Sequence, residues 1–403
     1  MAVNRTSKAK GKVVDIPGNA PTIGTATDDE TGTTISVAFT APSTTTGGPI
    51  FSYTAISNPG SFSNTGTSSP ITVSGLTLST AYTFTVAAVN PTGNSAYSAA
   101  SNSVTPTSPD RGFFTAGIGA QNYKTTEYIN IATTGNGTNF GNTDTHHVSG
   151  AAAGSSTRIL TIAGWDATTG LNTGTVEYFT IASSGSGTSF GSVTPTYLND
   201  PGSCSSSTRG VIGGGHIGSN TGVIEYFTIA STGNATNFGT LSVTRRENNG
   251  CISSTTRGLF AGGYTTTYVT TIDYITIAST GNATNFGACT VASSGGTSAS
   301  NATRGIRFVG NAGGTNSDAI EYMTIATTGN AVSFGTSSVA KSQAAAVANG
   351  TRVVFGGGNN GNGQGQTGYD YVTIATTGNT TSFGTLFTGR RALVGMSGSH
   401  GGI

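Results

Sequence analysis

The stretch that decides the fold is residues 209–239, which read RGVIGGGHIGSNTGVIEYFTIASTGNATNFG. Arg209 opens a short apolar run that ends in glycines, and Glu225 and Tyr226 lie within a second apolar run. Phe238, followed by glycine, comes twelve residues after the tyrosine. Short runs rich in Val, Ile, Phe, Tyr and Thr, separated by Gly, Ser and Asn, predict β-strands and turns.

The same pattern recurs along residues 110–403, so the repeat is the first property of this chain to settle. The arginines are Arg111, Arg158, Arg209, Arg257, Arg304 and Arg352, at spacings of 47, 51, 48, 47 and 48 residues. The Tyr-to-Phe distance is twelve in every repeat, which predicts a hairpin whose turn tolerates no insertion. A small-residue strand precedes most of the arginines. Each unit therefore has about four strands in about 48 residues, the size of a propeller blade.

The order of these elements resembles that of kelch repeats. In that family a strand ends in Gly-Gly, an acid–apolar–Tyr strand and a single aromatic residue follow, and an arginine precedes the next small-residue strand. Here the aromatic residue is Phe where kelch repeats commonly have Trp. The resemblance covers residues 110–403 and implies a six-bladed β-propeller.

The two ends of the repeat region bear on whether the propeller closes. The first unit begins directly at residues 111–117 and lacks the small-residue strand that should precede them. Residues 390–400 match that missing strand. We therefore expect the C-terminal strand to complete the first blade, which would close the ring and remove exposed sheet edges. An open solenoid would need polar caps at both ends.

Residues 18–107 predict a β-sandwich. Ile35 to Phe39 alternate apolar and polar residues, the period of a half-buried strand. Leu76 precedes a strand written Tyr-x-Phe-x-Val-x-Ala-x-Asn that starts at Tyr82. This leucine-to-tyrosine corner resembles fibronectin type III domains. The pattern departs from that family at the second strand, where Phe39 replaces the usual core Trp. The expected fold class is thus all-β, a sandwich followed by a propeller.

Residues 1–17 form a basic N-terminal arm. It carries four of the 17 basic residues of the chain, Arg5, Lys8, Lys10 and Lys12. Two interpretations are open: a solvated tail or a segment that docks the protein onto an assembly. The arm has no apolar core of a secretory signal peptide, and residues 103–109 read as a short stiff linker.

Composition excludes several functions. Only 8% of residues are charged and the net charge is +1, so neither nucleic acid nor an anionic membrane is an expected partner. No stretch approaches the roughly 18 apolar residues of a membrane span. The histidines and three cysteines show no metal-binding spacing, so no metal or other cofactor is expected. His146 and His147 are expected in an exposed turn, and Cys204 as a small buried residue.

The acids of the repeat admit a functional and a structural interpretation. They are Glu127, Glu177, Glu225, Asp273, Glu321 and Asp370. As a functional feature, the arginines and acids would form a charged ring around a channel. As a structural feature, each blade would hold one Arg–carboxylate or Arg–backbone pair near its strand ends, where an unpaired buried charge is costly. Repetition in every blade favours the structural interpretation, and we expect no catalytic residues.

The loops after the glycine-ending strands vary from repeat to repeat. Blade-specific loops on one face are the usual binding surface of repeat folds. The candidate ligand-binding residues there are Trp165, His216, Tyr264, Tyr268, Asn311 and Asn359. Aromatic and amide side chains of this kind suit sugars or a protein partner. The alternative is that they are ordinary solvated loop residues.

Domain pairing and composition resemble those of exposed proteins of tailed-bacteriophage particles, possibly of a cyanophage. The resemblance implies a non-enzymatic virion protein of a tail fibre, neck or head, oligomeric on the particle and assembled in the host cytoplasm. The arm would contact other virion proteins, and the propeller would contact host glycans or host protein. A secreted bacterial carbohydrate-binding adhesin, which would be extracellular, and a purely stabilising decoration protein are the alternatives.

Overall fold

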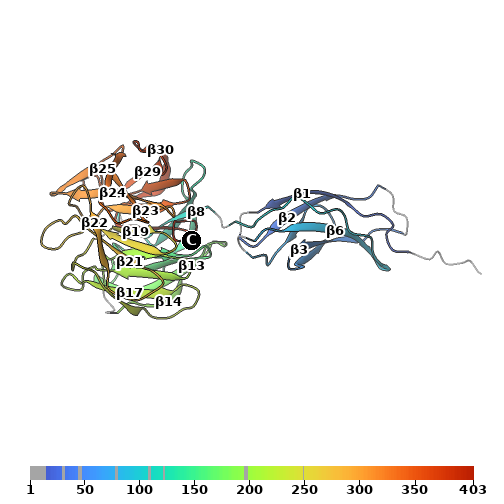
Figure 1. Ribbon diagram of the computed structural model, residues 1–403, viewed down its shortest axis with the longest axis horizontal. Coiled ribbons are helices and arrows are strands. Elements are labelled where there is room, and N and C mark those ends of the chain that lie inside the picture. The colour runs from blue at the N-terminus through green and yellow to red at the C-terminus, as the bar shows by residue number, and fades with distance from the viewer. Residues whose placement is uncertain are drawn as a thin grey trace, which may run out of the picture. The chain divides into compact units, whose positions relative to one another are not determined.

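The computed structural model describes residues 15–29, 32–43, 48–77, 80–107, 110–120, 123–194, 198–247 and 249–403, and the chain divides into two compact units, Met1–Ser108 and Pro109–Ile403. In these residues all regular structure is β-strand, as the sequence predicts (Figure 1). No helix that could cross a membrane occurs in the described part of the chain. The basic side chains at positions 5 to 12 lie outside the described residues.

The first unit consists of a three-stranded and a four-stranded antiparallel sheet among its described residues. The first sheet has the order β1–β2–β5 and the second has the order β4–β3–β6–β7. Their strands are β1 (Thr22–Asp28), β2 (Ile35–Thr40), β3 (Ser52–Asn58), β4 (Ser63–Gly66), β5 (Ile71–Val73), β6 (Thr83–Asn90) and β7 (Gly93–Asn94). The two sheets enclose one apolar core, which is the arrangement of a β-sandwich.

Alternating residues of these strands build that core. Phe39 is buried and its ring lies 4.7 Å from that of Tyr53. The hydroxyl of the buried Tyr82 accepts a hydrogen bond of 3.0 Å from the Thr77 amide. This bond closes the predicted tyrosine corner just before β6.

The described strands of the second unit form six four-stranded antiparallel sheets. The first strands are β11 (Ala151–Gly154), β15 (Gly202–Ser205), β19 (Asn249–Ser253), β23 (Thr297–Ser300), β27 (Ala345–Ala348) and β31 (Val394–Ser397). The second strands are β12 (Arg158–Asp166), β16 (Arg209–Gly213), β20 (Arg257–Ala261), β24 (Arg304–Ala312), β28 (Arg352–Gly356) and β8 (Arg111–Thr115).

The third and fourth strands complete each sheet. The third strands are β13 (Leu171–Thr180), β17 (Val223–Thr228), β21 (Thr271–Thr276), β25 (Thr315–Thr324), β29 (Gln366–Thr373) and β9 (Thr125–Asn130). The fourth strands are β14 (Thr188–Ser192), β18 (Thr236–Thr240), β22 (Thr284–Ala288), β26 (Val332–Thr336), β30 (Thr381–Arg390) and β10 (Thr138–Asn142). Each arginine of the repeat is thus the first residue of a second strand, and each acid lies in a third strand.

One sheet combines the two ends of the repeat region. β31 pairs antiparallel with β8, with Val394 opposite Thr115 and Ser397 opposite Gly112. The C-terminal strand therefore completes the sheet of β8, β9 and β10, as the sequence predicts. Successive first strands contact one another from β11 to β31, and β31 in turn contacts β11.

Neighbouring sheets are also joined at their fourth strands, by the Ser/Thr-Gly-Asn/Ser segment that recurs between the tyrosine and the phenylalanine of each repeat. Gly233 and Ala235 donate backbone hydrogen bonds to Phe190 and Ser192 of β14, in the preceding sheet. The Asn234 side chain accepts a bond of 3.1 Å from the Ser192 amide. The segment joins two antiparallel strands, as the predicted hairpin requires, and it also forms an arm that covers the edge strand of the neighbouring sheet. Its fixed length follows from that docking.

Candidate ligand-binding face

Six equivalent positions, here called the rim, lie at or just beyond the ends of the second strands. Each rim residue forms an isolated β-bridge with a residue of the loop that leads to a first strand. The rim residues are Ile118, Trp165, His216, Tyr264, Asn311 and Asn359, and their bridge partners are Arg391, Val148, Asn199, Arg246, Ser294 and Ser342. Five of the six candidate ligand-binding residues are therefore one structural position repeated around the unit, and Tyr268 is bridged to Tyr264.

Four of those candidates surround one cavity, here called the outer cavity. Its volume is about 440 Å³, and Tyr264, Tyr268, Asn311 and Asn359 line it. The two tyrosine rings lie 5.4 Å apart at a steep angle. The Tyr268 hydroxyl donates a hydrogen bond of 2.7 Å to the Asn311 side chain. The tyrosines are thereby held in one geometry before any ligand arrives.

Charged groups border the same cavity. The Arg246 guanidinium lies over the Tyr264 ring, 5.2 Å from its centre, and 3.6 Å from the Glu247 carboxylate. Arg391 is bonded to the Gln343 side chain at 3.1 Å. Aromatic faces, amides, two guanidiniums and one carboxylate thus border a single open cavity.

The structure places Trp165 and His216 elsewhere on the rim. Neither lines the outer cavity. Trp165 lies at the end of β12, opposite Asn172 of β13, and is partly exposed. The His216 ring accepts a bond of 3.4 Å from the Gly218 amide within its own loop. These two residues share the rim position with the others but not their cavity.

A second ring of equivalent residues, here called the entrance ring, lies next to the rim. It consists of Ser149, Asp200, Glu247, Gly295, Gln343 and Ala392. All six have left-handed backbone, with φ between 51° and 58°. Backbone hydrogen bonds connect neighbours in this ring, for example from the Asp200 amide to the Ser149 carbonyl and from the Ser149 amide to the Ala392 carbonyl.

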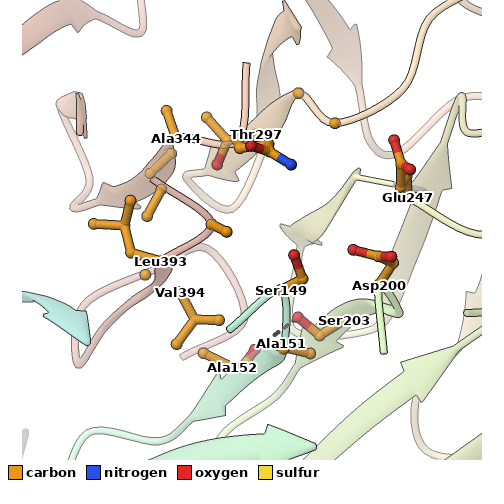
Figure 2. A pocket seen from close by; sticks show the side chains of 18 of the residues that line it. Ser149, Ala151, Ala152, Asp200, Ser203, Glu247, Thr297, Ala344, Leu393 and Val394 are labelled. Carbon is orange, nitrogen blue, oxygen red and sulfur yellow. Dashed lines mark hydrogen bonds between the residues drawn. The ribbon is translucent and has the colours of Figure 1, made fainter. Parts of the chain in front are cut away.

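The entrance ring leads into an inner cavity of about 120 Å³ between the first strands (Figure 2). Asp200 and Glu247 lie on one side of it and Leu393 and Val394 on another. Burial, followed by the nearby charge of Glu247, raises the pKa of Asp200 to about 7. A carboxyl group that is half ionised near neutral pH therefore faces the cavity.

The arginines and acids of the repeat do not pair with each other, and the carboxylate form of the predicted blade pair is wrong. Arg209 lies over the Tyr226 ring, 4.5 Å from its centre, and donates hydrogen bonds of 3.1 and 2.8 Å to the carbonyls of Ile277 and Ala278 in the next sheet. Glu225 lies opposite Ile212. Since that is three residues beyond the arginine, the two positions are about 10 Å apart along the strand.

The other five arginines stack and bond in the same way as Arg209. The stacked pairs are Arg111 with Tyr128, Arg158 with Tyr178, Arg257 with Tyr274, Arg304 with Tyr322 and Arg352 with Tyr371. Their guanidiniums bond to backbone carbonyls of the adjacent sheet. Each arginine therefore ties one sheet to the next.

The acids instead hold the loops that lead to the first strands. Glu177 accepts hydrogen bonds of 2.8 Å from the amides of Asp144 and Thr145. Most of these acids also contact a buried basic side chain (His, Lys or Arg), here called a buried base, that the sequence pattern does not reveal. The pairs are Glu177 with His147, Asp273 with Arg245, Glu321 with Arg307, Asp370 with Lys341 and Glu127 with Arg390.

The sequence pattern did not reveal these buried basic side chains, because the residue type at their position varies. His147, Arg245, Lys341 and Arg390 all immediately precede a bridge partner of the rim, so one position holds three residue types. In the β23 sheet that position is Ser293, and Arg307 from β24 fills the space and donates to its hydroxyl at 2.6 Å. The predicted exposed turn is consequently wrong for His147, which is fully buried.

No group of three or more His, Cys, Asp or Glu in the described part of the chain is arranged to hold a metal ion. Cys204 is fully buried in an apolar cluster, as predicted. The carboxylates of the repeat are engaged by backbone amides and buried bases.

Comparison with known proteins bears on the first unit. No curated protein matches the chain. Residues 19–104 match the family model described as Fibronectin type III domain. The sandwich geometry and the tyrosine corner agree with that match, and residues 19–104 form a fibronectin type III domain.

Proposed function

We propose that the second unit is a closed six-bladed β-propeller of the kelch kind. Six four-stranded sheets, the pairing of β31 with β8 and the contact of β31 with β11 support the proposal. In such a ring the first strands are innermost, and the rim and entrance-ring residues share one face. Closure by the C-terminal strand leaves no sheet with an open inner edge.

We propose that this face binds glycans and that the protein is a non-enzymatic binding and display protein. The observation that carries the proposal is the convergence of Tyr264, Tyr268, Asn311 and Asn359 on the outer cavity. Its volume of about 440 Å³ falls within the range typical of ligand sites, roughly 300–1,000 Å³. Tyrosine faces stack on the apolar side of a sugar ring, and amide and guanidinium groups bond to its hydroxyls.

The biological setting we propose is the surface of a tailed-phage particle, with host-surface glycans as ligands. The basic arm, the fibronectin type III spacer and the repeat composition support this setting through their resemblance to virion proteins. A secreted adhesin would use the same face for the same chemistry. A stabilising decoration protein would use no ligand, and the convergent cavity favours the binding function over it.

A glycan array probed with the whole chain tests the proposed binding. We expect saturable binding to a restricted set of glycans, and loss of that binding in Tyr264→Ala and Tyr268→Ala. Tyr97→Ala is the matched control, because Tyr97 is an exposed tyrosine of the first unit. Equal binding by all three variants, or no glycan bound by the wild type, would refute the proposal.

The particle setting needs a separate measurement. Cryo-electron microscopy of the particle that carries this chain should show residues 1–17 in contact with a capsid or tail protein and the second unit facing outward. Recovery of the protein only as a free species in culture medium would contradict the virion setting. The glycan test is unaffected by either outcome.

A further inference from the structure

The C-terminal residues of the chain pack against the ends of the first strands that lie farthest from the inner cavity. The His400 ring donates from Nε2 to the Gly154 carbonyl at 3.1 Å, and the Gly401 amide donates to the Ser300 carbonyl. Gly154 and Ser300 end their first strands, whereas the cavity is lined by the beginnings of those strands. The cavity, here called the cup, therefore lies between the entrance ring and the beginnings of the first strands.

The walls of this cup differ in character. Figure 2 shows Asp200 and Glu247 together on one side, with Ala344, Leu393 and Val394 facing them across the opening. Asp200 and Glu247 are the charged residues among those that line the cup. The first strands of six sheets occupy equivalent positions, so a purely structural lining would not need this asymmetry.

We propose that the cup binds a small organic cation, a protonated primary amine with a short apolar body, whose ammonium group faces Asp200 and Glu247 and whose carbon chain lies against Leu393, Val394 and Ala344. The inference goes beyond glycan binding at the rim and does not depend on it.

The size of the cup suits such a ligand. Its volume of about 120 Å³ is several times the roughly 10–15 Å³ that one water molecule requires. A short alkyl chain gains from leaving water for the apolar wall. An ammonium group supplies three donors to the two carboxylates opposite.

The state of Asp200 supports the same ligand class. Its pKa is raised to about 7 by burial and then by the charge of Glu247, and a hydrogen bond with Ser149 opposes this shift only in part. The Arg246 guanidinium lies 3.6 Å from the Glu247 carboxylate. Its charge lowers the pKa of Asp200, but by less than burial and Glu247 raise it. A bound ammonium would relieve the repulsion between the carboxylates.

Isothermal titration calorimetry of the whole chain with n-butylammonium chloride tests the proposal, with n-butanol and sodium butyrate as comparison ligands of similar shape. We expect saturable binding of the amine, and affinity at least about tenfold weaker for the alcohol and for butyrate. Because ionised Asp200 binds the cation better, the amine should bind more tightly at pH 8 than at pH 6.

Two variants locate the site. Asp200→Asn should weaken amine binding by about tenfold or more, and Ala344→Leu should block it by filling the cup. Asp318→Asn is the matched control, because it removes one carboxylate at an exposed position of β25. Thermal unfolding of each variant confirms that it is folded. Equal binding of amine and alcohol, or unchanged binding in Asp200→Asn and Ala344→Leu, would overturn the proposal.

Discussion

At the residue scale, the buried carboxylates of the repeat have the same position but different electrostatic environments. Glu127 contacts Arg390, which is fully buried and also donates to the carbonyls of Ala116 and Thr125. Glu225 accepts a bond of 3.0 Å from the Thr194 amide. Within the described residues it has no ion-pair partner, because Leu198 occupies the position of the buried base.

This contrast predicts effects of different size for the same substitution. Glu127→Gln should lower the free energy of unfolding by about 3–5 kcal/mol, because it leaves the Arg390 charge buried without a counter-ion. Glu225→Gln should change it by less than about 1 kcal/mol, because it removes a carboxylate that burial disfavours and whose pKa burial raises. Urea denaturation of both variants at neutral pH measures the difference. Similar losses in the two would show that Arg390 is not the cause.

Asp200 predicts a pH dependence. Its pKa is raised from 3.8 to about 7, so between these values the folded state binds more protons than the unfolded state. The contribution of Asp200 to stability is therefore present at low pH and is lost as pH rises towards 7. Relative to the wild type, Asp200→Asn should gain stability from pH 5 to pH 8 in urea denaturation. A constant difference across this range would show that Asp200 titrates normally.

At the element scale, the glycine that follows each phenylalanine of the repeat is explained by the arm of the next sheet. A Cβ added at Gly191 would lie well inside van der Waals contact of the Gly233 carbonyl. The same close approach recurs from sheet to sheet, for instance between Gly287 and Gly329. Each arm must therefore lie directly over a residue that has no side chain.

Two glycine substitutions test this contact from its two sides. Gly191→Ala should destabilise the second unit by about 1–3 kcal/mol or more, because a backbone carbonyl must move. Gly233→Ala should be neutral or stabilising by up to about 1 kcal/mol, since a Cβ there meets no atom within 4 Å. Differential scanning calorimetry reports both. Equal effects would contradict the docking of the arm.

The same element shows how far the sequence could predict the structure. Strand number, strand order and the strand that completes the β8 sheet follow from spacing, because a repeat must bury the same face each time. The docking of the Ser/Thr-Gly-Asn/Ser arm onto the next sheet could not be predicted from the sequence, since a turn and a docked arm have the same composition. The rim could be predicted from loop variation, although the cavity that unites Tyr264 and Asn311 depends on which loops are neighbours.

The partners of the repeat arginines and acids were harder to predict. Two opposite charges per repeat suggest an ion pair. In the structure Glu225 lies opposite Ile212, three residues along the strand from Arg209, which is too far for an ion pair. The actual bases vary between histidine, lysine and arginine, and in one sheet the base comes from a different strand, at Arg307. The repeat pattern therefore did not reveal these basic residues, because the residue type at their shared position changes from sheet to sheet.

At the scale of the whole molecule, the C-terminal residues have two separable tasks. β31 completes the β8 sheet and contacts β11. Residues 398–403 instead pack against the ends of the first strands, where His400 is buried and the Gly402 amide donates to its Nδ1 at 3.0 Å. Burial lowers the pKa of His400 to about 4, so the ring is neutral at physiological pH.

Two truncations should therefore behave differently. A chain that ends at residue 397 should keep the cooperative unfolding of the second unit with reduced stability, because it loses only the contacts of His400 and Gly401 with the ends of the first strands. A chain that ends at residue 390 exposes the edges of β8 and β11 and should lose that transition and aggregate. The first unit, which is compact by itself, should unfold as in the intact protein in both. Calorimetry and light scattering distinguish these outcomes. A monomeric, cooperatively unfolding chain that ends at residue 390 would show that the other five sheets are stable without β31.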